Sequence, residues 1–192
     1  MRIVIATDIF GKTPEFSRCL ESFPFAYHLV DPYQGKYQSF ADEHSAYQYF
    51  INNVGINAYA GHLAQVIQAD ESPTVVIGFS VGAAALWQAS AMSAINHVVA
   101  GFGYYGSQIR HQIELQPQFE LQLVFPRTEP SFDVGELVNQ LAATAKVNAV
   151  QCQYLHGFIN PLSVNFHPRG CADALQYLTK QVGRLSDSMT RT

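Results

Sequence analysis

The sequence predicts an α/β protein in which a mostly parallel sheet of six strands lies between two layers of helices. Short β-branched apolar runs alternate with helix-forming segments along the 192 residues. Hydrophobic residues make up 48% of the chain and charged residues 14%, which is typical of a protein with a well-buried core. Because this length suits one domain better than two, we expect a single domain over residues 1–184 and a polar tail over residues 185–192.

Six apolar runs predict the strands. Each is short, is rich in β-branched or aromatic residues, and ends at polar or turn-forming residues. In chain order the expected strands are residues 2–7, 26–30, 73–77, 97–101, 119–125 and 147–155.

Capping signals between these runs predict the helices. Thr13 and Pro14 supply an N-cap and a first-turn proline, and Asp133 with Glu136 forms a capping-box pair. The alanine-rich segment after residue 82 favours a helix through its composition alone. In chain order the expected helices are residues 13–21, 42–69 in two pieces that divide near Gly55, 81–93, 133–145 and 168–183.

The sequence Gly78-Phe79-Ser80-Val81-Gly82 carries the strongest chemical signal. It joins a predicted buried strand to a predicted helix, which is the setting of a nucleophile elbow. In such an elbow the serine sits on a sharp, strained turn, and side chains two residues away on either side would collide with that turn. The motif therefore predicts that Ser80 is a nucleophile, whereas the alternative is an ordinary tight turn.

A nucleophilic serine needs a base, and His156 is the candidate that the sequence favours among seven histidines. It follows the last expected strand, at the edge where parallel sheets place their chemistry. His167, just before the last helix, is the alternative. The acid should follow the fifth strand, where Glu129 is the first carboxylate, and Asp133 is the competitor although it already has a role as an N-cap.

Two loops are candidates for an oxyanion hole. The amide of Val81 lies at the start of the helix that follows the nucleophile, where backbone N–H groups are free. The second amide should come from residues 8–11, after the first strand, where Gly11 would let the backbone approach a substrate closely. The alternative for this segment is an ordinary strand-to-helix loop.

Charge and cysteine usage exclude several classes of partner. The net charge is −4 and the 11 basic residues are scattered, so we expect no binding to nucleic acid. The three cysteines are widely spaced and form no zinc-ligand pattern, and we expect neither a metal nor an organic cofactor. The first strand leaves no room for a signal peptide and no apolar run reaches transmembrane length. We therefore expect a cytoplasmic protein that does not bind membranes.

Four motifs together resemble the dienelactone hydrolase family of the α/β-hydrolase superfamily, over nearly the whole chain. They are residues 9–11, 78–82, 103–106 and 156–158. The resemblance implies that the amide of Ile9 joins that of Val81 in the oxyanion hole. It also implies that the Tyr-Tyr-Gly stretch shapes the pocket. The aromatic residues that we expect to line the pocket are Phe10, Phe79, Tyr104, Tyr105 and Phe158, although Phe79 could equally pack in the core.

The chain departs from that family in several places. The founding enzymes carry cysteine where this chain has Ser80, which favours ester over dienelactone chemistry. The family acid is usually aspartate, whereas this chain has Glu129. The founding enzymes also have a glutamate where this chain has Asp8, so we carry no regulatory role over to Asp8. The chain also begins at what would be the third strand, which predicts a trimmed α/β-hydrolase fold. Its second strand would then be a sheet edge, which residues 33–39 or a homodimer could cover.

These observations predict a serine hydrolase that cleaves small carboxylic esters or thioesters through an acyl-serine intermediate, at an open site without a lid. Two alternatives remain at this point. An amidase or peptidase could use the same triad, and a protein of this fold could bind ligands without catalysis.

Overall fold

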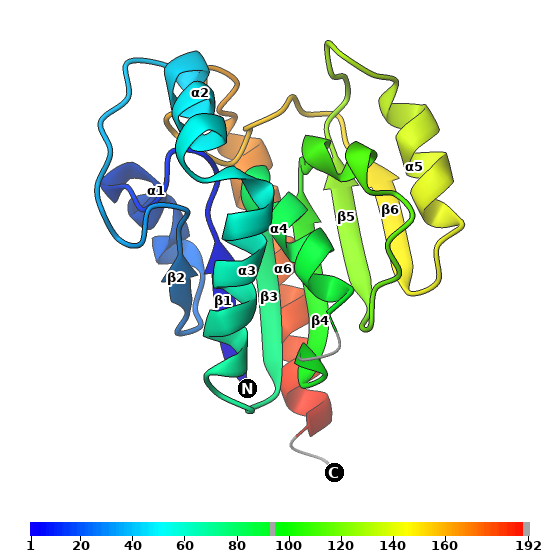
Figure 1. Cartoon of the computed structure of the whole chain (residues 1–192). Coiled ribbons are helices and arrows are strands. Elements are labelled where there is room, and N and C mark those ends of the chain that lie inside the picture. Colours follow the sequence, from blue (N-terminus) through cyan, green and yellow to red (C-terminus); the bar gives the residue numbers. More distant parts are fainter. Residues whose placement is uncertain (93–94, 190–192) are drawn as a thin grey trace.

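All six strands of the protein run parallel in one sheet, in the order β2-β1-β3-β4-β5-β6 (Figure 1). The computed structural model describes residues 1–92 and 95–189. The strands are β1 (Arg2–Ala6), β2 (His28–Val30), β3 (Thr74–Phe79), β4 (Val98–Tyr104), β5 (Leu121–Phe125) and β6 (Val147–Gln151). The α/β sandwich predicted from the sequence is confirmed.

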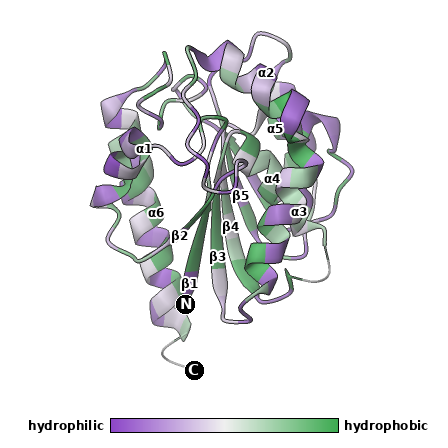
Figure 2. Cartoon of the chain, turned by 60° about the vertical axis from the view of Figure 1, so that its left-hand side comes forward, coloured by the Kyte–Doolittle hydropathy of each residue, from purple (hydrophilic) through white to green (hydrophobic). Residues whose placement is uncertain are grey.

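Helices cover both faces of the sheet (Figure 2). On one face α1 and α6 pack against apolar residues of β1 and β3, and on the other α3, α4 and α5 enclose a second core around Trp87. The α-helices are α1 (Pro14–Cys19), α2 (Glu43–Asn53), α3 (Gly55–Gln68), α4 (Val81–Ser90), α5 (Val134–Ala142) and α6 (Pro168–Met189). Two short 3-10 helices are η1 (Leu20–Ser22) and η3 (Ser107–His111).

Several element ends differ from the sequence expectation. Strand β6 ends at Gln151, four residues early, although Arg127 N still donates a hydrogen bond to Tyr154 O beyond it, 2.7 Å away. Helix α6 continues past Gly183 to Met189, because Leu185 still packs against the core. The expected tail is thus helical over residues 185–189, and residues 190–192 lie outside the described part. Residue 93, where the helix after Ser80 was expected to end, also lies outside it.

Strand β2 is an edge of the sheet, as the sequence predicts, and has only three residues. Such a short strand exposes few unpaired backbone groups. Tyr33, just after β2, packs against Tyr49 of α2 with ring centroids 5.6 Å apart, which ties this segment to α2. Whether a second copy of the chain covers the edge stays a prediction.

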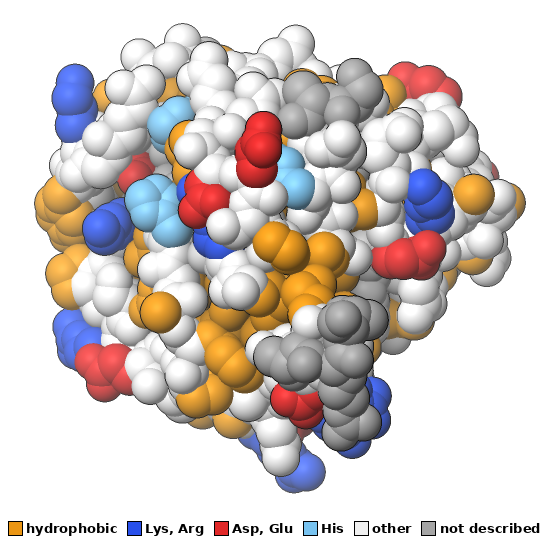
Figure 3. Space-filling model, turned by 90° about the horizontal axis from the view of Figure 1, so that it is seen from below, with side chains coloured by type: hydrophobic (Ala, Val, Ile, Leu, Met, Phe, Trp, Pro, Cys, Tyr) orange, Lys and Arg blue, Asp and Glu red, His pale blue; other side chains and the backbone are white. Residues whose placement is uncertain are grey.

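The end of the molecule where the strands begin shows no gathering of one charge sign. On this face Lys and Arg side chains lie among acidic, histidine and apolar ones (Figure 3). Within residues 1–92 and 95–189, none of the helices combines the length and the apolar character that crossing a membrane would require. The absence of nucleic-acid partners stays a prediction.

Helix α4 crosses the end of β1 at a very short distance. A Cβ atom added at Gly82 would overlap the carbonyl oxygen of Ala6 and lie 2.5 Å from that of Thr7. Both obstacles are backbone atoms, of the last residue of β1 and of the residue that follows it, so neither can rotate away as a side chain could. This contact therefore requires glycine, and it sets how deeply the N-terminus of α4 sits against the sheet.

We predict that Gly82→Ala destabilises the fold by about 2–3 kcal/mol or more, because the strand or the helix must shift to admit the methyl group. The matched control is Gly61→Ala within α3, where an added Cβ meets nothing within 4 Å. That change should stabilise the protein by about 0.5–1 kcal/mol, as expected for alanine in a helix interior. Urea denaturation measures both, and equal effects of the two substitutions would contradict the argument.

Candidate active site

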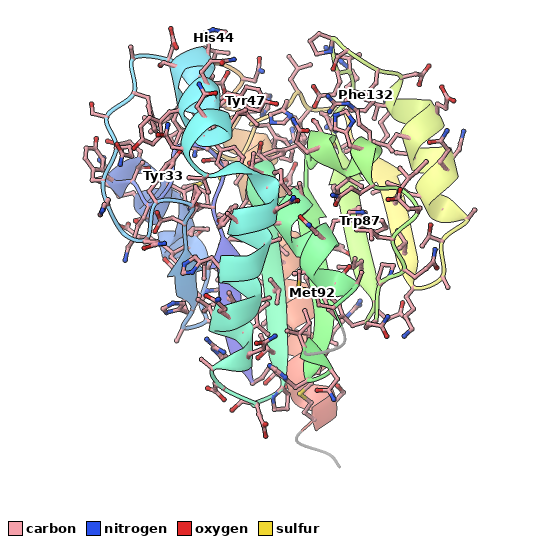
Figure 4. All side chains as sticks on the ribbon, in the orientation of Figure 1. Tyr33, His44, Tyr47, Trp87, Met92 and Phe132 are labelled. Carbon is pink, nitrogen blue, oxygen red and sulfur yellow. The ribbon has the colours of Figure 1, made fainter. Side chains whose placement is uncertain are left out.

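A cavity of about 450 Å³ opens at the carboxyl ends of the strands. Ser80, Glu129 and His156 all line it, from the segments that follow β3, β5 and β6. Helix α2 forms one wall, where His44 and Tyr47 lie, and the loop that carries Phe132 lies across from it (Figure 4). The cavity therefore gathers residues that are far apart in the sequence.

Ser80 has the strained backbone expected of a nucleophile elbow. Its φ is 52° and its ψ is −114°, in a region that non-glycine residues rarely occupy. Its N–H donates to Tyr104 O at 2.9 Å, which fastens the turn to β4. A Cβ atom at Gly78 would lie 2.5 Å from Gly82 O, so the turn closes only because both flanking residues are glycine.

His156 lies beside Ser80, with its Nε2 3.0 Å from Ser80 Oγ. His156 lies in the loop after β6. Asn165 Nδ2 donates a hydrogen bond to His156 O at 3.0 Å, which holds the backbone of this loop. The ring of Tyr105 packs against the imidazole with centroids 5.1 Å apart. His167, the sequence alternative, instead caps the start of α6 by accepting from Gly170 N at 3.1 Å.

Glu129 completes a chain of hydrogen bonds, with Oε1 2.7 Å from His156 Nδ1. Its side chain is only 9% exposed. Burial opposes ionisation, but hydrogen bonds from His156 and Ser107 and the positive charge of Arg110 outweigh it and lower the pKa of Glu129. Asp133, the competing carboxylate, caps α5 by accepting from Glu136 N at 3.0 Å. The structure thus brings Glu129, and not Asp133, to the histidine.

The two expected oxyanion amides both border the cavity. Within the described residues, neither Ile9 N–H nor Val81 N–H has a hydrogen-bond partner. In the loop after β1, Asp8 instead occupies the neighbouring amides, since Phe10 N donates to Asp8 Oδ1 at 3.0 Å and Gly11 N to Asp8 O at 3.1 Å. The Ile9 amide is therefore left available to a ligand.

The expected lining aromatics divide into two groups. Phe10 and Tyr105 line the cavity. The other three lie in the core beneath α1 and α6, because strand alternation turns Phe79 and Tyr104 away from the serine and Phe158 stacks on Tyr154 with centroids 4.9 Å apart. These core residues shape the cavity from behind without touching its contents.

Sequence reasoning missed several residues of this site. Ser107 and Arg110 come from η3, in a segment that predicted only a loop, and Glu43 with Tyr47 comes from α2. The only available signal was the proximity of Ser107 to the Tyr-Tyr-Gly stretch. Within the described residues, no group of three or more His, Cys, Asp or Glu side chains is arranged to hold a metal ion.

Asp8 and Asn160 form a buried link between the loop after β1 and the loop that carries His156. Asn160 Nδ2 donates to Asp8 Oδ2 at 2.7 Å, and the two side chains are 0% and 3% exposed, respectively. Burial raises the pKa of Asp8 to about 6, although the hydrogen bonds from Asn160 and Phe10 oppose the rise. The link fixes the spacing of two loops that face the same cavity.

Comparison with known proteins identifies a relative of this chain and supports its fold. No family model matches the chain. The chain is 30% identical over 172 residues to YczH, an uncharacterised protein of Bacillus subtilis (strain 168), with 86% of this chain and 84% of YczH covered. The chain belongs to the same family as YczH. The similarity spans most of both proteins.

Solved structures show that this chain has the α/β-hydrolase fold, as the sequence predicts. A protein assigned as a dienelactone hydrolase from Klebsiella pneumoniae has a TM-score of 0.71 at 14% identity, over 92% of this chain and 83% of that chain. A dienelactone hydrolase-like promiscuous phosphotriesterase from metagenomic libraries has a TM-score of 0.67 at 17% identity, over 95% and 85%. A cold-adapted esterase from an Arctic intertidal metagenomic library has a TM-score of 0.58 at 16% identity, over 93% and 82%.

The raised pKa of Asp8 predicts a pH dependence of stability. The folded state binds the Asp8 proton more tightly than the unfolded state, in which the pKa of Asp8 is near 3.8. Protonation of Asp8 therefore stabilises the fold, and this stabilisation is fully present below pH 3.8 and is lost as pH rises through about 6. Between about pH 6 and about pH 4, the free energy of unfolding of wild type relative to Asp8→Asn should rise by about 1 kcal/mol per pH unit of acidification.

Urea denaturation across this range measures the effect, with Glu114→Gln, at an exposed carboxylate, as the control. A constant difference between wild type and Asp8→Asn at all pH values would contradict a raised pKa of Asp8.

Proposed function

We propose that the protein is a serine hydrolase that cleaves small carboxylic esters or thioesters through an acyl-Ser80 intermediate. The observation that carries the proposal is a continuous chain of contacts in the lining of the cavity. His156 Nε2 lies 3.0 Å from Ser80 Oγ, and His156 Nδ1 lies 2.7 Å from Glu129 Oε1. Nucleophile, base and acid in this connection are the arrangement that acyl transfer requires.

The first half of the reaction forms the acyl-enzyme. Ser80 Oγ attacks the acyl carbon while its proton passes to His156 Nε2, and Glu129 holds the opposite nitrogen in its protonated form. The tetrahedral intermediate then breaks the bond to the leaving alkoxide or thiolate, which takes the proton from His156. In the second half, water attacks the acyl carbon with His156 again as base, and the carboxylic acid and Ser80 are released.

Free backbone amides support the charge that develops in this reaction. The N–H groups of Ile9 and Val81 have no intramolecular partner within the described residues and border the same cavity as Ser80. Val81 begins α4, whose positive dipole end favours an anion. We assign these two amides to the oxyanion hole.

The cavity supports small substrates. Its volume of about 450 Å³ lies within the ordinary range for small-molecule sites. Two structural neighbours are a cold-adapted esterase and a promiscuous phosphotriesterase, and both of these activities cleave ester bonds, which supports ester chemistry here. A cytoplasmic location stays a prediction.

The proposal predicts covalent labelling by a fluorophosphonate probe, in which the Ser80 oxygen displaces fluoride from phosphorus. Labelling should be lost in Ser80→Ala and kept in Ser72→Ala, since Ser72 precedes β3 at the opposite end of that strand. Fluorescence of the labelled band on a denaturing gel measures it. Folded wild-type protein that takes up no label would contradict the proposal and favour a binding protein.

The two candidate acids can be separated by turnover of a p-nitrophenyl ester. Glu129→Gln should lower kcat by about 10²–10⁴-fold, because the amide cannot stabilise imidazolium and can favour the wrong tautomer of His156. Asp133→Asn should change kcat by less than about threefold, since asparagine is an equally good N-cap. If only the Asp133 substitution were costly, the assignment of Glu129 would be wrong.

A further inference from the structure

The segment after β4 places a serine hydroxyl at the junction of the acid and the base. Ser107 Oγ donates a hydrogen bond to Glu129 Oε1 and lies 3.1 Å from His156 Nδ1. With the 2.7 Å contact between Nδ1 and Oε1, these three atoms form a closed triangle. We propose that Ser107 is a positioning residue that holds the Glu129 carboxylate in line with His156, and this inference rests on the proposed hydrolase function.

The proton count of the triangle fixes the direction of each bond. An ionised Glu129 offers only acceptors, whereas Ser107 Oγ and His156 Nδ1 each carry one proton. Both protons can point to Oε1 at the same time. His156 then presents an unprotonated Nε2 to Ser80, as a general base requires, and Ser107 adds a second donor to the same carboxylate oxygen.

The backbone before Ser107 is built to place this hydroxyl. Tyr105 has a positive φ of 43°, and Gly106 adopts an inverse γ-turn with φ −77° and ψ 68°, closed by Ser107 N donating to Tyr105 O at 2.9 Å. A Cβ at Gly106 would lie 2.8 Å from the Cδ1 atom of Ile109 and 3.0 Å from the Cβ atom of Ala83. The Tyr-Tyr-Gly stretch thus sets the position of the serine that follows it.

Arg110 secures Ser107 to the loop that carries the acid. Its Nη1 donates to Ser107 O at 2.5 Å, and its guanidinium lies 4.9 Å from the centroid of the Phe132 ring. Phe132 in turn forms an isolated backbone bridge with Glu129. Helix η3 and the acid loop are therefore joined twice, once through Arg110 and once through the Ser107 hydroxyl.

A glutamate needs this support more than an aspartate does. Its side chain has one more rotatable bond, so its carboxylate can leave the line of the imidazole at a smaller energetic cost. Hydrogen bonds from His156 and Ser107 to one oxygen leave the carboxylate a single favourable orientation. Ser107 thereby compensates for the longer acid of this chain.

The decisive experiment is a double-mutant cycle on kcat for a p-nitrophenyl ester. Ser107→Ala alone should lower kcat by about 10-fold with KM nearly unchanged, and Ser107→Thr, which keeps the hydroxyl, should restore most of it. In a Glu129→Ala background, Ser107→Ala should have almost no further effect, because the carboxylate that it holds is gone. A purely structural role would instead give effects that multiply, and that result would overturn the proposal.

A second readout needs no turnover. Ser107→Ala removes a hydrogen bond to the ionised carboxyl group, so the pKa of Glu129 should rise, by about half a unit or more. Carbon-13 NMR of glutamate-labelled protein measures it, with the Glu129 signal identified by its loss in Glu129→Ala. An unchanged titration midpoint of Glu129 in Ser107→Ala would overturn the role of Ser107, even if the protein hydrolysed no ester. A raised midpoint together with ester turnover that does not require Ser80 would overturn only the proposed function.

Discussion

The site depends on the contact between the N-terminus of α4 and the end of β1. Gly82 sits against backbone carbonyls of Ala6 and Thr7, and Gly78 sits against Gly82 itself. With both side chains absent, the chain can turn within one residue, and Ser80 is forced to a φ of 52°. Its hydroxyl then stands above the sheet edge with the free amide of Val81 beside it. The same close packing brings the loop after β1, with the Ile9 amide, to the cavity that Ser80 lines.

The parallel sheet supplies the partners of that serine. Because all six strands run the same way, the loops after β1, β3, β4, β5 and β6 leave the sheet at one edge. In chain order, these loops contribute the Ile9 amide, the Ser80 hydroxyl, the Ser107 hydroxyl, the Glu129 carboxylate and the His156 imidazole, among other groups. Two buried or half-buried side-chain links then fix the spacing between loops, Asp8 with Asn160 and Ser107 with Glu129. Strand order therefore determines which groups meet, and the links determine how closely.

The sequence was sufficient for the fold and for the three groups that the structure brings together, because both depend on local patterns. Apolar runs mark strands, and Ser80, Glu129 and His156 each follow one. It was insufficient where side-chain direction or long-range contact decides. The expected fourth strand ends at residue 101, so the sequence pattern indicates no direction for the side chain of Tyr104. The position of α2 over the site depends on packing between distant segments. The role of Ser107 depends on a strained turn at Tyr105 that no local propensity indicates.

Two carboxylates near His156 show how environment separates their tasks. Glu129 and Asp8 are both largely buried, yet the pKa of Glu129 is lowered and that of Asp8 is raised. Around Glu129, donors from His156 and Ser107 and the charge of Arg110 favour the ionised form. At Asp8 the cost of burial dominates, and the hydrogen bonds from Asn160 and Phe10 and the charge of His156 oppose it without outweighing it. In the proposed mechanism Glu129 stays ionised where imidazolium would form, whereas Asp8 loses its charge as pH falls through about 6. An ionised carboxylate in the loop of Ile9 would oppose the proposed oxyanion, so protonation of Asp8 below about pH 6 would weaken this opposition. The hydrogen bonds of Asp8 to Phe10 and Asn160 meanwhile shape the loop.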